Sequence, residues 1–210
     1  MTRSQANLLL LAVAIVWGSA FVAQAHGMDG VEPFTFTGIR FLLGVCIVAP
    51  FAWRDWRSIS RREVPPGRRD LLGVVLLGLL LTLGAVFQQI GLVTTTVTNA
   101  GFLTALYVPL VPMLSWLILR VRPHWSVWPT SLGCLVGTWM LSGAGNLNLG
   151  IGDAWVIASS LFWALHVLFV GKIADRIAAP FLVACGQFFV CGIACLFWGA
   201  LTETITLEGI

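Results

Sequence analysis

The sequence is poor in charged residues. They make up 10% of its 210 residues, whereas about a quarter of the residues of a soluble domain are charged. It also lacks the long tracts of glycine, serine or proline that mark linkers. Hydrophobic residues, by contrast, make up 58% of the chain. This balance excludes both an ordinary soluble domain and a disordered chain.

The apolar residues are gathered in blocks of about 20, the length that an α-helix needs to cross roughly 30 Å of hydrocarbon. These blocks predict an all-α, polytopic membrane protein with about seven transmembrane spans. We place the spans near residues 7–25, 34–53, 71–92, 99–119, 125–144, 153–171 and 181–201.

The basic residues indicate how the chain is threaded through the membrane. Six arginines lie between the second and third predicted spans, and other basic residues lie at Arg3, in 120–122 and in 172–176, all on one side. Only Arg40 lies elsewhere. Because lysine and arginine are enriched on the cytoplasmic side, we predict a multi-pass protein of the plasma (inner) membrane with a cytoplasmic N-terminus. The net charge of +3 then reflects topology, and we expect no nucleic-acid partner.

All cysteines fall within predicted spans. Such thiols pack as small apolar groups, and we expect them to be free. A metal site would need more ligands nearby, so we expect neither a metal nor another cofactor. The five cysteines are Cys46, Cys134, Cys185, Cys191 and Cys195.

A repeat links the first two predicted spans to the last two. In each pair a proline follows a tryptophan, 16 residues later in the first pair and 17 in the second. Seven residues after the proline comes a polar residue followed by a phenylalanine; the polar residue is arginine in the first pair and glutamine in the second. The matched positions are Trp17 and Trp163, Pro33 and Pro180, and Arg40 and Gln187. The two copies start five spans apart, so the second would cross the membrane in the opposite direction. Inverted repeats of this kind build the central sites of many transporters.

Several longer motifs occur in a fixed order. They are WGSAFV at 17–22, IRFLLG at 39–44, QQIGLVTTTVTNAGFLTALYVPLVPMLSWLIL at 88–119, LGCLVGTWML at 132–141 and GDAWVIASSLFWALHVLFVGK at 152–172. With these motifs the chain resembles the EamA-type ten-span permeases of the drug/metabolite transporter superfamily, over nearly its whole length. One departure is LRVRP at 119–123, where the family often has a glutamate.

The resemblance implies inverted repeats of five transmembrane helices around a central cavity. Residues 1–145 would form the first repeat, and residues 146–210 would form the first two helices of a truncated second repeat. Members of the family export small metabolites, such as amino-acid-like solutes or drugs, by alternating access. The partners implied are the lipid bilayer and a small-molecule substrate. Missing helices or a second chain would be needed to complete the cavity, and we expect the chain not to transport by itself.

Arg40 is the one charge placed within a span. It lies about seven residues, or roughly 10 Å, from the outer end of that span, and a charge at the bilayer centre costs about 2.5–3.5 kcal/mol on insertion scales. Three roles are open. The guanidinium holds a substrate carboxylate through forked hydrogen bonds, bonds the carbonyls of broken helix ends, or extends toward the outer headgroups.

Other residues within the spans are candidates for the cavity lining. Amide and phenol groups in spans turn inward, where they bond each other or a ligand, and His166 is either a proton relay or a core histidine. The cavity candidates are Arg40, Gln88, Gln89, Asn99, Tyr107, Trp17, Trp163, His166 and Gln187. Pro109 and Pro112 are candidates for a hinge or gate, because proline removes a backbone hydrogen bond and kinks a helix.

Other interpretations stay open. The chain could be an intramembrane receptor or scaffold without transport, or an inactive fragment of a permease. An intramembrane enzyme would need paired carboxylates, a Ser/His pair or a metal cluster. Since no aspartate or glutamate lies deep in a predicted span, we do not expect an enzyme.

Overall fold

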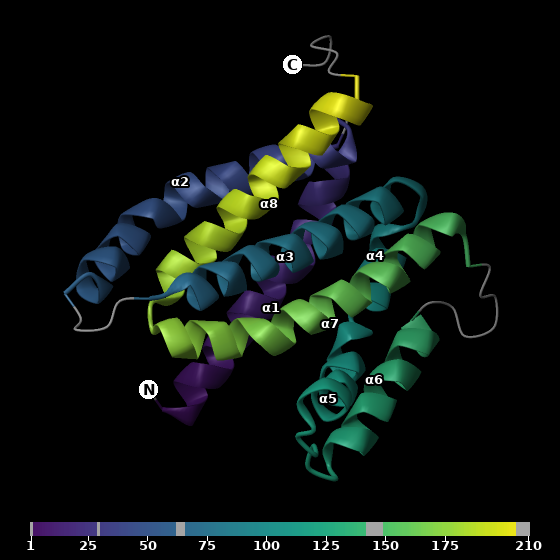
Figure 1. Ribbon diagram of the computed structural model, residues 1–210. Helices are drawn as coiled ribbons and strands as arrows, with labels where there is room; N and C mark the ends of the chain where they lie inside the picture. The colour runs from purple at the N-terminus through teal and green to yellow at the C-terminus, as the bar shows by residue number, and fades with distance from the viewer. Residues whose placement is uncertain (1, 29, 62–65, 142–148, 205–210) are drawn as a thin grey trace.

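The computed structural model describes residues 2–28, 30–61, 66–141 and 149–204, and within these ranges every regular element is an α-helix. Figure 1 shows their arrangement. The helices are α1 (Arg3–His26), α2 (Pro33–Ile59), α3 (Arg68–Thr94), α4 (Val97–Thr104), α5 (Tyr107–Leu119), α6 (Val127–Leu141), α7 (Ile151–Ile177) and α8 (Pro180–Thr202). The predicted all-α fold is confirmed.

Six helical segments of the described ranges are long and apolar enough to cross a membrane, with α4 and α5 counted as one segment. They correspond to six of the seven predicted spans. The seventh, predicted at 125–144, corresponds to the shorter helix α6. Its predicted end, and the predicted repeat boundary between residues 145 and 146, lie outside the described residues.

The span predicted at 99–119 is not one continuous helix. It is interrupted at residues 105–106, between α4 and α5. A proline removes the hydrogen bond to the carbonyl four residues earlier, and its ring clashes with that carbonyl. For Pro109 this residue is Ala105, inside the interruption, whereas Pro112 lies within α5. The helix is therefore interrupted one turn before Pro109, where this proline disrupts the backbone hydrogen bonding, and the role of Pro109 and Pro112 as a hinge or gate stays a prediction.

The helices are packed in a row that begins with the antiparallel pair α2 and α8. Helix α3 packs against both α8 and α7, α7 packs against α5, and α5 packs against α6. One apolar cluster lies where the ends of α2, α7 and α8 meet, around Ile59, Ile177 and Val183. We call this the basic end of the bundle, because Arg57, the start of α3 and Arg176 also lie there.

Helices α3 and α7 approach each other closely at two glycines. A Cβ atom added to Gly91 would lie 2.6 Å from the carbonyl oxygen of Gly152, and one added to Gly152 would lie 2.6 Å from the carbonyl oxygen of Gly91. Because any side chain would collide with backbone at these positions, the two glycines permit the observed spacing of the helices.

The N-terminus of α8 is capped by a side chain of α2. The helix begins at Pro180, where the missing N–H costs nothing because the first turn leaves its donors unpaired. The next two backbone N–H groups, of Phe181 and Leu182, donate to Oδ2 of Asp55 at 2.8 and 3.2 Å. A carboxylate at a helix N-terminus is also favoured by the helix dipole.

The N-terminus of α2 is capped in the same way by the residue that follows α8. This helix also begins at a proline, Pro33. The backbone N–H groups of Phe34 and Thr35 donate to Oε1 and Oε2 of Glu203 at 2.6 and 2.8 Å, and the Thr35 hydroxyl donates to Oε2 at 2.7 Å. Helices α2 and α8 therefore cap each other, at opposite ends of their contact.

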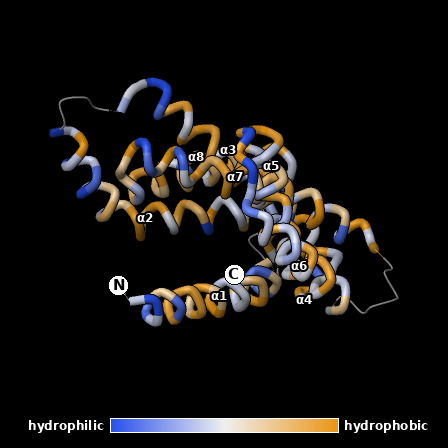
Figure 2. The backbone as a smooth tube through the Cα atoms, turned by 90° about the horizontal axis from the view of Figure 1, so that it is seen from below, coloured by the Kyte–Doolittle hydropathy of each residue, from blue (hydrophilic) through white to orange (hydrophobic). Residues whose placement is uncertain are grey.

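Helix α1 is the least covered of the spanning segments. In its most apolar stretch only 6% of the residues are buried, compared with 39% in α3. Figure 2 shows α1 lying apart from α2, with apolar residues along its length. A few side chains near its C-terminal end, including Phe21 and Gln24, are buried against the other helices. Most of its surface is apolar and exposed.

Candidate substrate-binding site

Arg40 lies on the face of α2 that meets α8. Its guanidinium carbon is 5.5 Å from the ring centre of Phe36 and 5.1 Å from that of Phe41, within the range of cation–π attraction. It also interacts electrostatically with Cys191 and Cys195 of α8. Among the described residues, no carboxylate lies within salt-bridge distance of Arg40.

The residues of α8 near Arg40 form a row of polar side chains along one helix face, which we call the polar file. Gln187, Cys191 and Cys195 are four residues apart and therefore share one helix face, and all three are buried. The two thiols lie close to each other, and Cys191 also lies close to Thr82 of α3. The five cysteines are all free, as expected. This file places hydrogen-bonding groups between α2, α3 and α8.

Trp163, His166 and Gln187 meet where α7 faces α8. Nε2 of His166 lies 2.7 Å from Oε1 of Gln187, so a proton on Nε2 makes a hydrogen bond between two buried side chains. The rings of Trp163 and His166 are 6.0 Å apart and nearly perpendicular. The indole N–H of Trp163 is buried and has no partner among the described residues, and its ring packs against Gly84 of α3.

The predicted glutamines of α3 are buried, but they face different helices. Nε2 of Gln88 donates to the Thr104 hydroxyl of α4 at 2.8 Å. Nε2 of Gln89 lies 3.5 Å from the backbone carbonyl of Gln24 in α1. The side-chain oxygens of Gln24 and Gln89 are buried and have no donor within the described part of the chain. These amides join α3 to α1 and α4.

The remaining candidates lie in two further places. Asn99 donates to Oδ1 of Asp153 at 3.4 Å, and this carboxylate also accepts hydrogen bonds from Thr95 and from the backbone N–H of Gly150. Asp153 therefore caps the start of α7 and links it to the ends of α3 and α4. The rings of Trp17 and Tyr107 lie 6.2 Å apart, between α1 and α5.

The predicted candidates do not form a single site. His166 joins Gln187 and Trp163 at one place, and Arg40 lies near Cys191 and Cys195 further along α8. The other five are spread over contacts of α1, α3, α4, α5 and α7. Gln24, Thr104 and the two capping carboxylates of Asp55 and Glu203 were not predicted from the sequence. The two carboxylates could have been found from their spacing in the sequence, because Asp55 follows Pro33 by 22 residues and Glu203 follows Pro180 by 23.

Long apolar helices that cap each other and enclose buried polar side chains describe a polytopic membrane protein. Comparison with known sequences places it more closely. Residues 4–143 match the EamA-like transporter family. The chain belongs to this family.

The relatives of the chain carry transporter names. It is 31% identical to an uncharacterized transporter of Archaeoglobus fulgidus over 202 residues, 96% of this chain and 60% of the relative. It is 26% identical to the uncharacterized inner membrane transporter YedA of Escherichia coli K12 over 171 residues, 78% of this chain and 52% of that protein. The chain thus spans between about half and three fifths of these relatives. No solved structure matches it.

Proposed function

We propose that this protein is a permease that exports small metabolites by alternating access, through a cavity between two inverted repeats. The first repeat would comprise residues 1–145, and α7 and α8 would begin the second. The N-terminus and the basic end would face the cytoplasm of a cell whose inner membrane holds the protein. Membership of the EamA-like family supports transport rather than catalysis.

The mutual capping of α2 and α8 is the observation that carries this proposal. Asp55 of α2 binds the first turn of α8, and Glu203 after α8 binds the first turn of α2. The two carboxylates follow the starting prolines of their helices at nearly equal distances, 22 and 23 residues. If inverted symmetry relates the two helices, each should carry a capping carboxylate at a matching position, as these two do.

Two equivalent phenylalanines support the same axis. Phe41 and Phe188 each lie eight residues after the proline that starts their helix. Their rings pack on each other, with centres 5.4 Å apart. In a two-fold arrangement, a residue contacts its own equivalent only near the axis. The axis would therefore pass between α2 and α8 close to Arg40 and Gln187, which precede these phenylalanines.

The different surroundings of α1 and α7 fit an unfinished second repeat. In the proposed symmetry α1 corresponds to α7, which packs closely on α3. The equivalent of α3 would pack on α1, whose apolar surface is exposed at Val13, Val16 and Trp17. Helices outside these 210 residues, or a second chain, would cover it and complete the cavity.

Arg40 would bind the substrate in this cavity. Its guanidinium lies within 5.5 Å of the ring centres of Phe36 and Phe41 and has no carboxylate partner among the described residues. A carboxylate-bearing solute would supply the missing charge through two parallel hydrogen bonds. Gln187 and the thiols beside it would contact the rest of the solute.

An export assay with matched arginine variants tests this function. Cells that express the chain together with the helices or second chain that complete its cavity are loaded with labelled amino-acid-like solutes and drugs, and efflux is followed together with the amount of protein in the membrane. We expect Arg40→Gln to abolish export at unchanged abundance, and Arg40→Lys to retain only part of it, because lysine lacks the fork. Arg122→Gln, in the loop after α5, should export normally.

Two results would contradict the proposal. Efflux of every tested solute at the level of cells without the protein would remove the transport function. Normal export by Arg40→Gln would remove Arg40 from the binding site, and a loss of abundance in this variant alone would assign the arginine a structural role.

A further inference from the structure

A cavity of about 450 Å³ lies at the basic end, between α2, α3, α7 and α8. Its wall is mainly apolar, formed by Trp56, Ile59, Leu71, Val74, Leu182 and Val183. Trp56 and Leu71 are 51% and 65% exposed, so the cavity reaches the outer surface of the bundle. In a membrane this surface is in contact with lipid, and an apolar hollow there is filled by hydrocarbon rather than by water.

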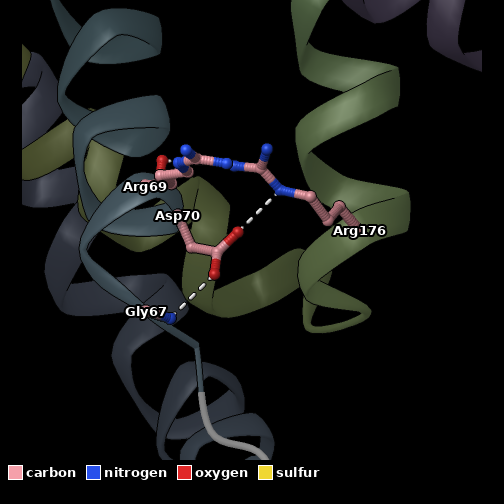
Figure 3. A network of polar contacts seen from close by, with 4 residues as sticks. All are labelled: Gly67, Arg69, Asp70 and Arg176. Atoms are coloured by element: carbon pink, nitrogen blue, oxygen red, sulfur yellow. Dashed lines mark hydrogen bonds and ion pairs between the residues drawn. The ribbon is translucent and has the colours of Figure 1, made fainter.

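The mouth of this cavity is positively charged. Arg68, at the start of α3, forms part of the lining, and Arg69 and Arg176 lie beside it. Figure 3 shows Arg176 reaching from α7 to α3, where Nε contacts Oδ1 of Asp70 at 2.6 Å and Nη2 donates to the Arg69 carbonyl at 3.2 Å.

Asp70 does not cancel this positive charge. Its second oxygen, Oδ2, accepts the backbone N–H of Gly67 at 2.8 Å, so both carboxylate oxygens are engaged and its charge is balanced by Arg176. Arg68 has no carboxylate within salt-bridge distance in the part of the chain that the structure describes. Within the described residues, one cation at an apolar cavity is therefore left without a counter-charge. It lies at the start of a helix long enough to span a membrane, and the ends of such helices lie near the headgroups.

We propose that this cavity binds one anionic glycerophospholipid of the adjoining leaflet. The phosphate lies at Arg68, and an acyl chain enters between Leu71, Val74 and Leu182. Basic pockets between transmembrane helices suit such headgroups, which are concentrated in the cytoplasmic leaflet. The bound lipid touches four helices and holds the basic end of the bundle together. This inference does not depend on transport.

Thermal unfolding of the purified protein in nanodiscs tests the lipid site. The discs contain phosphatidylcholine alone or with added phosphatidylglycerol, and native mass spectrometry counts the lipids retained. We expect phosphatidylglycerol to raise the unfolding midpoint of the unchanged protein and of Arg122→Gln equally. Arg68→Gln should lose roughly half of this rise or more, because it removes the charge-assisted contact to the phosphate.

A second variant tests the acyl chain separately from the charge. Leu71→Trp narrows the mouth without altering its charge and should also reduce both the rise and the number of retained lipids. The proposal is overturned if phosphatidylglycerol gives the unchanged protein no advantage, if Arg122→Gln loses as much as Arg68→Gln, or if Leu71→Trp keeps the full rise. An equal rise with inorganic phosphate in detergent would assign the site to free phosphate and would also overturn it.

Discussion

At the scale of single residues, Arg40 is the side chain that fits its surroundings least well. A charge within a span costs about 2.5–3.5 kcal/mol on insertion scales, and cation–π contacts return about 0.5–2 kcal/mol each. The rings of Phe36 and Phe41 therefore offset much of this cost without a carboxylate. This makes a ligand-free Arg40 tolerable and leaves its hydrogen-bond donors available.

The hydrogen bond between His166 and Gln187 yields a prediction about stability. Gln187→Leu should lower the free energy of unfolding by about 1–3 kcal/mol, because it leaves a buried imidazole N–H without an acceptor. Chemical unfolding in mild detergent, followed by circular dichroism, measures this difference. Adding His166→Phe removes the orphaned donor, so the double variant should regain part of the loss. A double variant that is no more stable than Gln187→Leu would contradict this account.

At the scale of helices, the pairing of α2 with α8 rests on interactions at both ends of their contact. A carboxylate of one helix accepts two or three hydrogen bonds from the first turn of the other. Between these ends Gly38 faces Leu196 and Gly192 faces Leu42, and a Cβ atom at either glycine would lie 2.7 Å from the leucine side chain. The caps fix the ends of the pair, and the glycines fix its spacing.

Removing a capping carboxylate should lower the free energy of unfolding more than removing an ordinary surface carboxylate does. Glu203→Gln should lower the free energy of unfolding by about 1–2 kcal/mol, because an amide NH₂ then faces backbone donors and the helix N-terminus loses its negative charge. Asp55→Asn should have a similar effect at the other end. Asp175→Asn, on the exposed side of α7, is the control and should stay within about 0.5 kcal/mol. Equal stability of all three variants would show that the caps contribute nothing.

At the scale of the whole molecule, the distribution of arginines and the exposure of α1 describe how the bundle sits in its membrane. The basic end gathers the starts of α3 and α8 with the ends of α2 and α7. Lipid and further helices are the two environments that can cover the apolar side chains of α1, because water cannot solvate a spanning surface without cost.

Reporter fusions test the orientation of the whole bundle. Fusions within residues 172–176 and at Arg61 should report a cytoplasmic location, and fusions at Leu149 and Thr204 should report the opposite side. The physical reason is the bias of lysine and arginine toward the cytoplasm. Opposite locations for Arg61 and residues 172–176 would contradict the arrangement in which α2 and α7 both end at the basic end. They would also remove the proposed inverted repeat.

The class of this protein could be determined from its sequence because hydropathy and charge are local properties of each segment and do not depend on its partners. A block of about 20 apolar residues becomes a spanning helix whatever its neighbours are, so the all-α fold was predicted correctly, as was the family. The aspartates that cap α3 and α7, Asp70 and Asp153, likewise act on their own helices, each through the glycine three residues before it.

Only the tertiary structure decided which polar residues meet. Gln88 and Gln89 are neighbours in sequence but bond to different helices, and Arg40 faces two thiols that the sequence marked only as packing groups. These contacts depend on the rotation and spacing of helix pairs, which glycines such as Gly91 and Gly152 set through close backbone approach. Such distances arise between segments far apart in the chain, so no local pattern contains them.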